Sequence, residues 1–114
     1  MLATPPTLEK ISANNARTIG TNFAADHLGD QIGVGMPWRV VSSLRSAWVV
    51  PLVLTSPGYG VVGIVGVVIV DEELGNISAW TAVEEVIANA DQLLEERKDD
   101  LDAAFKRAIA QATL

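Results

Sequence analysis

The sequence predicts an α+β fold in which an antiparallel sheet of three to four strands packs with an N-terminal helix and a long C-terminal helix. Three observations predict it: two valine-rich segments of strand length in the middle of the chain, an amphipathic pattern before them and another after them. A length of 114 residues suits one domain, 1–114, and 49% hydrophobic residues are enough for a core.

The first predicted helix runs from about residue 7 to residue 28. Its apolar residues recur at helical spacing: Leu8, Ile11, Ala16, Ile19, Phe23 and Leu28. Residues 4–7, TPPT, are a typical helix entry, and Gly29 stands where a left-handed C-cap belongs. Residues 30–36 then predict a glycine-containing connector.

Four segments are predicted as strands: 37–45, 47–54, 61–70 and a short one at 77–80. The TSPGYG segment between the second and third predicts a hairpin. These two valine-rich strands do not alternate, so we expect both sheet faces to be covered, one by a helix and the other by a helix or a second subunit. Gly63 and Gly66 indicate a bulge or a close backbone approach.

The C-terminal helix is expected to begin with a capping box, Thr81 as N-cap and Glu84 at N3. Its apolar stripe lapses at residues 95–100, EERKDD. Either one long helix projects past the domain there, or two helices join there with Asp99 or Asp100 as a cap.

A projecting helix needs a partner for the apolar residues of its second half, which favours a homodimer. The interface candidates are Leu101, Phe105, Ile109 and Trp48.

A membrane helix is an alternative for residues 46–70, which carry no charge. Pro51 and the TSPGYG segment divide this run into pieces of strand length, which favours the sheet. Residues 1–20 contain no apolar run of signal-peptide length, so a cytoplasmic location is expected.

The composition excludes several kinds of chemistry. A net charge of −6, from 14 acidic and 8 basic residues, argues against nucleic acid as a partner. The absence of cysteine excludes disulfides, thiol nucleophiles and cysteine metal sites, and the single histidine excludes a multi-histidine site. We therefore expect no metal site and no cofactor.

The string G-x-G-x-x-G occurs at residues 58–63. A valine run follows it, whereas a dinucleotide loop opens a helix, so we interpret it as a hairpin turn with packing glycines. The polar residues kept as ligand-binding candidates are His27, Tyr59, Asp71, Glu72 and Glu73.

Three segments resemble PepSY-like domains: AADHLGD at 24–30, AWVVPLV at 47–53 and VVIVDEELGNI at 67–77. Asp71 and Gly75 match the aspartate and glycine of the closing strand pattern V-x-V-D-x-x-T-G-x-I, while Leu74 stands in place of its threonine. The resemblance covers about residues 7–80. It implies a non-catalytic module of the kind linked to peptidase regulation, often outside the cytoplasm.

The function expected from the sequence is a small non-catalytic interaction or regulatory module that forms a homodimer and has a possible protein partner. The alternative is a small-molecule-binding or enzymatic domain with a pocket between the sheet and the C-terminal helix.

Overall fold

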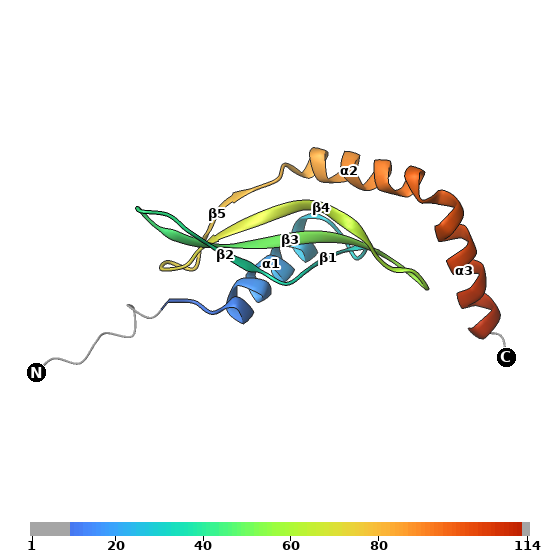
Figure 1. Ribbon diagram of the computed structural model, residues 1–114, viewed down its shortest axis with the longest axis horizontal. Coiled ribbons are helices and arrows are strands. Elements are labelled where there is room, and N and C mark those ends of the chain that lie inside the picture. Colours follow the sequence, from blue (N-terminus) through green and yellow to red (C-terminus); the bar gives the residue numbers. More distant parts are fainter. Residues whose placement is uncertain (1–9, 113–114) are drawn as a thin grey trace, which may run out of the picture.

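The computed structural model describes residues 10–112 and confirms the α+β class (Figure 1). Its elements in chain order are α1 (Ala13–His27), β1 (Ile32–Val34), β2 (Trp38–Val41), β3 (Ser46–Ser56), β4 (Gly60–Asp71), β5 (Ile77–Trp80), α2 (Val83–Glu96) and α3 (Lys98–Ala112). The antiparallel sheet has five strands rather than three or four.

The strand order is β1-β3-β4-β5, and β2 pairs with β3 on the same edge as β1. β1 pairs with residues 52–54 of β3, and β2 pairs with residues 46–49. Strands that follow one another in the sequence therefore lie next to one another or share a partner, and β3 holds the centre of the sheet.

The predicted β3–β4 hairpin is confirmed, and β4 contains two irregularities beside its internal glycines. Leu52 pairs with Gly66 and Val53 with Ile64, so Val65 is an extra residue; a second shift leaves Val62 unpaired. A Cβ on Gly63 would lie 2.8 Å from Leu93 Cδ1. The sequence predicted a bulge or a close backbone approach at Gly63 and Gly66, and the structure has both.

Both helices that pack on the sheet cover the same face. A Cβ on Gly20 of α1 would lie 2.7 Å from Val50 Cγ1, and one on Gly66 of β4 would lie 3.1 Å from Val86 Cγ2 of α2. Val50 and Leu52, the partner of Gly66, are two residues apart in β3 and so share a face. The core cluster lies here and contains Ala16, Phe23, Ala24, Val50, Leu52, Leu54, Val62, Val65, Val68, Val70, Val86 and Leu101.

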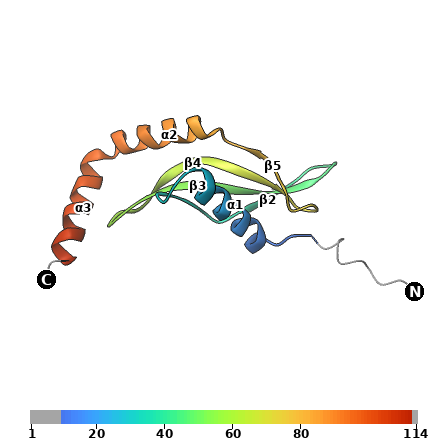
Figure 2. The same cartoon turned by 180° about the vertical axis from the view of Figure 1, so that it is seen from behind.

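The expectation that a helix could cover the second face is wrong for the described residues. Figure 2 places α1 in front of the strands, and Figure 1, from the opposite side, places the strands in front of α1. α2 lies beside β4, where β5 does not extend. The two helices therefore share one layer, and the strands form the other.

The start of α1 is a correction, because the helix begins at Ala13 and not at residue 7. Ser12 is the N-cap, and its hydroxyl accepts a hydrogen bond from Asn15 N at 3.1 Å. Ile11 is held outside the helix, since its N–H donates to the Glu72 carbonyl at 2.9 Å. The proposed entry at residues 4–7 lies outside the described residues. The end agrees, with Gly29 in the left-handed region at φ +90°.

The first two strands also differ from prediction. Residues 30–36 contain β1, and the segment 37–45 holds only a four-residue strand, β2. A turn follows β2, in which the Ser42 hydroxyl donates to the Arg45 carbonyl at 2.6 Å. Pairing with β3 creates β1, a non-local effect that a three-residue pattern containing Gly33 cannot indicate.

The predicted capping box at Thr81 is wrong. The N-cap of α2 is Ala82, which makes no side-chain cap. The Thr81 hydroxyl instead accepts a hydrogen bond from Val67 N at 3.0 Å, and the Thr81 N–H donates to the Val67 carbonyl. Thr81 thus extends the pairing of β5 with β4, and the helix starts one residue later.

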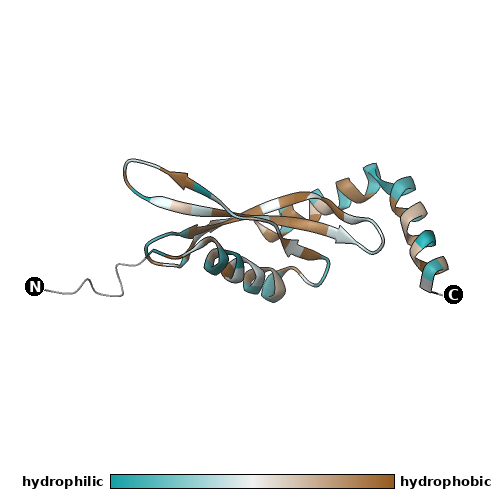
Figure 3. Ribbon diagram, turned by 60° about the horizontal axis from the view of Figure 1, so that its bottom comes forward, coloured by the Kyte–Doolittle hydropathy of each residue, from teal (hydrophilic) through white to brown (hydrophobic). Residues whose placement is uncertain are grey.

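The C-terminal helix is two helices, which decides between the two alternatives kept for residues 95–100. Arg97 is the C-cap of α2, and α3 begins at Lys98, so Asp99 and Asp100 lie in the first turn of α3 and do not cap it. Figure 3 shows mainly hydrophilic colour at the junction and hydrophobic colour along the central strands.

α3 lengthens the molecule. The radius of gyration is 17.7 Å, whereas a compact chain of this length has about 13 Å. Residues 46–70 form β3 and β4, so the alternative of a membrane helix there is wrong. Within residues 10–112, no helix combines the length and the apolar character needed to cross a bilayer.

Candidate functional site

The acidic segment after β4 forms a turn that uses its own carboxylate. Asp71 Oδ1 accepts hydrogen bonds from Glu73 N at 2.9 Å and Leu74 N at 2.8 Å. The Gly75 N–H closes the turn on the Asp71 carbonyl, with Gly75 at φ +73°. Asp71 therefore has the role of a turn residue, and Glu73 is exposed.

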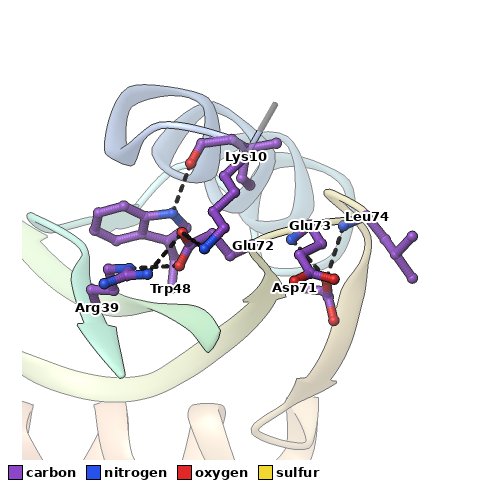
Figure 4. A network of polar contacts seen from close by, with 8 residues as sticks. Lys10, Arg39, Trp48, Asp71, Glu72, Glu73 and Leu74 are labelled. Carbon is purple, nitrogen blue, oxygen red and sulfur yellow. Dashed lines mark hydrogen bonds and ion pairs between the residues drawn. The ribbon is translucent and has the colours of Figure 1, made fainter. Parts of the chain in front are cut away.

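Glu72 is the centre of a polar cluster that joins distant parts of the chain (Figure 4). Arg39 of β2 binds its carboxylate with two hydrogen bonds, 2.6 Å from Nε to Oε2 and 3.1 Å from Nη2 to Oε1. Lys10 Nζ lies 3.8 Å from Oε1. The Glu72 side chain is only 5% exposed, so Glu72 is a buried part of the fold and not a solvent-facing carboxylate.

The same cluster fixes the segment that precedes α1. Trp48 Nε1 donates to the Ile11 carbonyl at 3.1 Å, while the Ile11 N–H donates to the Glu72 carbonyl. Arg39 and Trp48 are paired residues of β2 and β3. The cluster thus joins the entry of α1, β2, β3 and the turn after β4.

Glu72 gives the fold a specific response to acid. The hydrogen bonds from Arg39 hold the pKa of the Glu72 carboxyl below its ordinary value of 4.5, against the opposing effect of burial. A lowered folded-state pKa means that the ion pair contributes its full stability above the ordinary value and loses it as the pH falls through the lowered one.

We therefore expect Glu72→Gln to show a weaker loss of stability than the wild type between about pH 5 and pH 3, and a lower stability than the wild type at pH 7. Urea unfolding at each pH measures both effects. Glu73→Gln is the matched control, because Glu73 is exposed on the same turn. Parallel pH profiles for the wild type and Glu72→Gln would contradict the assignment.

The ligand-binding candidates do not meet in one site. Tyr59 lies at the tip of the β3–β4 hairpin, where its hydroxyl accepts a hydrogen bond from Arg97 Nη1 at 3.1 Å. Asp71 lies at the opposite end of β4, which has 12 residues, and at about 3.3 Å per residue this separates the two by roughly 40 Å. His27 is exposed in the last turn of α1, with its ring 4.6 Å from that of Phe23.

The interface candidates fall into two groups. Leu101 is buried and belongs to the core cluster, and Trp48 is half-buried against the same cluster. Phe105 and Ile109 are exposed, on the part of α3 not covered by the hairpin tip. Only the second pair is available to another chain.

A pocket does lie between the sheet and the C-terminal segment, where the alternative function placed one. Its volume is about 170 Å³, and it is lined by Leu28, Gln31, Ile32, Leu54, Val86, Ile87, Ala90, Asp91 and Leu94. None of the five ligand-binding candidates lines it. Asp91 is its one ionisable lining residue, so the walls offer apolar contact and a single carboxylate.

The described residues contain neither a metal-binding cluster nor an unpaired buried polar side-chain atom. They hold no group of three or more histidine or acidic side chains that could bind a metal ion. Among them, no buried side-chain polar atom is without a hydrogen-bond partner. The carboxylates that the turn and the cluster bring together are engaged in structural contacts, so this arrangement clamps the fold rather than offering a free acid or base.

Two features of possible functional weight were missed from the sequence. Arg39 and Lys10 bind Glu72, and no local spacing could indicate pairing across more than 30 positions. The second feature is the apolar pair Trp38 and Val40 on one face of β2. Their alternation with Arg39 could have indicated this face, because residues two apart in a strand share a face.

Comparison with family models, curated proteins and solved structures finds no match to this chain.

Proposed function

We propose that this protein is a small non-catalytic interaction or regulatory module that works as a homodimer. One observation carries the proposal: large apolar side chains remain exposed on the sheet, on its connecting segments and on both C-terminal helices of an elongated chain. They are Met36, Trp38, Val40, Val41, Leu44, Val61, Ile64, Leu74, Trp80, Ile87, Leu94, Phe105 and Ile109. Monomers rarely leave extended apolar patches open to water.

The distribution of polar groups supports a role without catalysis. The candidate residues His27, Tyr59 and Asp71 lie apart, and the buried acids Asp71 and Glu72 are engaged by turn N–H groups and by Arg39. A cytoplasmic location and the PepSY-like resemblance, with its link to regulation, belong to the same proposal.

Sedimentation equilibrium of the wild-type chain tests the homodimer. We expect a particle of twice the 12.1 kDa chain mass at micromolar concentration. A monomer at all concentrations up to hundreds of micromolar would refute it.

The pocket beside Leu54 and α2 favours a second candidate, the binding of a small, largely apolar molecule. A thermal-shift screen with nucleotides, metal ions and metabolites tests it, since a ligand that binds the native state raises the unfolding temperature. A shift of several degrees that Ala90→Phe abolishes would support this function; no shift with any compound would count against it.

A further inference from the structure

One face of the sheet carries no helix in the described part of the chain. The strand register puts these residues on it, here called the open face: Gly33, Trp38, Val40, Ala47, Val49, Pro51, Val53, Thr55, Val61, Ile64, Val67, Ile69, Asp71 and Ala79. Val49 and Val53 are buried between their neighbours, yet neither belongs to the core cluster, because that cluster lies on the opposite face.

Larger side chains at both ends of the open face remain exposed. Trp38 and Val40 of β2 are about half exposed, and Ile64 of β4 is more exposed still. At Gly33 nothing lies within 4 Å of the position of a Cβ, so the face is also open above β1. Side chains at the centre of the open face are therefore buried, while those at its ends are exposed to solvent.

Among the strand residues of the open face, Asp71 is the one charged side chain, in a chain that has 14 acidic and 8 basic residues. Within the five strands, the charged residues are Arg39 and Asp71. Arg39 lies on the helix-covered face, where it binds Glu72. Asp71 lies on the open face, opposite Ala47 at the end of β4. Its side chain is 8% exposed and lies 3.8 Å from Arg45 Nη1, and its carboxylate accepts hydrogen bonds from the following turn. A partner that packs on this face therefore does not have to remove water from an unpaired charged side chain of the strands.

The size of the open face fits a small but stable interface. β3 has 11 residues, about 36 Å at roughly 3.3 Å per residue. Because β1, β2 and β5 have only three or four residues each and neighbouring strands lie about 4.8 Å apart, the face covers roughly 540 Å². Two copies would together bury about 1,100 Å², close to the lower end of the range for specific complexes.

We propose that the open face is where a second copy of this chain packs, sheet against sheet. The inference rests on the proposed homodimer and names its interface. An apolar surface whose one carboxylate is already paired within its own chain complements itself, which suits the two-fold interface in which the same patch serves both subunits. Two sheets pack in this way about 10 Å apart, and the valine-rich inner strands of β3 and β4 then have both faces covered.

The test compares substitutions of one kind on different surfaces. Ile64→Glu and Val40→Glu place a carboxylate on the open face, and Ile87→Glu places one on α2 of the covered side. Ile64 and Ile87 are matched in type and exposure, at 61% and 54%. Sedimentation equilibrium gives the dissociation constant of each variant, and circular dichroism and urea unfolding verify that each is folded.

The wild type and Ile87→Glu are expected to dimerise equally well, and the two open-face variants at least tenfold more weakly. Phe105→Glu tests the alternative that the exposed part of α3 forms the dimer interface. If the wild type is dimeric but Ile64→Glu and Val40→Glu dimerise as it does, the open face is excluded while the homodimer stands. The same holds if Phe105→Glu alone yields monomers. A monomeric wild type refutes both proposals.

Discussion

Gly58→Ala is expected to detach α3 from the hairpin tip and to lower the free energy of unfolding by about 2–4 kcal/mol. Gly58 has φ +75°, which is unfavourable for alanine, and a Cβ there would lie 2.7 Å from the Ala104 carbonyl oxygen and 3.0 Å from Ala108 Cβ. The carbonyl belongs to the backbone of α3 and cannot rotate away, so the helix must move.

Gly60→Ala is the matched control for this prediction. Gly60 has φ +91° in the same turn region, but nothing lies within 4 Å of its Cβ position. Gly60→Ala should therefore lower the free energy of unfolding by only about 1–2 kcal/mol, which is the cost of placing alanine at a positive φ. Urea unfolding at one fixed protein concentration measures both losses, and hydrogen exchange of the α3 amides reports the detachment. Equal losses in the two variants, with α3 still protected, would contradict the assigned contact.

Leu52→Ala is expected to lower the free energy of unfolding by about 2–5 kcal/mol. Leu52 is fully buried in the central strand, on the face that α1 and α2 cover. Alanine there loses apolar contacts and leaves a cavity that the surrounding strands and helices cannot close. Since domains have only about 5–15 kcal/mol of stability in total, this loss is a large part of it.

Leu44→Ala makes the same chemical change where the side chain is 93% exposed. We expect it to alter the free energy of unfolding by less than about 0.5 kcal/mol. Urea unfolding of the two variants at equal concentration gives the comparison. Similar losses at Leu44 and Leu52 would mean that the covered face of the sheet is not the core.

The parts of the fold that depend on local pattern were predictable. The valine runs indicated β3 and β4, the TSPGYG segment indicated their hairpin, and Gly29 indicated the end of α1. The helix interruption at residues 95–100 was visible as a lapse in the apolar stripe, although the sequence left open whether one helix or two would result.

The parts that depend on distant partners were not predictable. Ser12 starts α1 because Ile11 is bonded to the turn at Glu72. Thr81 fails to cap α2 because its hydroxyl bonds to Val67. The structural role of Glu72 was not visible in the sequence because its partner, Arg39, lies 33 positions away. In each case a group that local rules assign to one role has a stronger partner elsewhere in the fold.

The candidate site followed the same rule. Residue type alone selected His27, Tyr59 and the acidic turn, but spacing along the chain could not reveal that β4 separates Tyr59 from Asp71. The α3 residues predicted to form the homodimer interface divide in the same way, because Leu101 is buried in the core cluster whereas Phe105 and Ile109 are exposed.

The attachment points of the first and last described segments have a mechanical consequence. Ile11 is fastened at the Glu72 end of the sheet, and α3 is packed against the hairpin tip at the other end. Tension applied through these two segments acts along β3 and β4, and the ladder hydrogen bonds lie perpendicular to that direction. The strands would then be loaded in shear, with all rungs sharing the force, rather than unzipped one rung at a time.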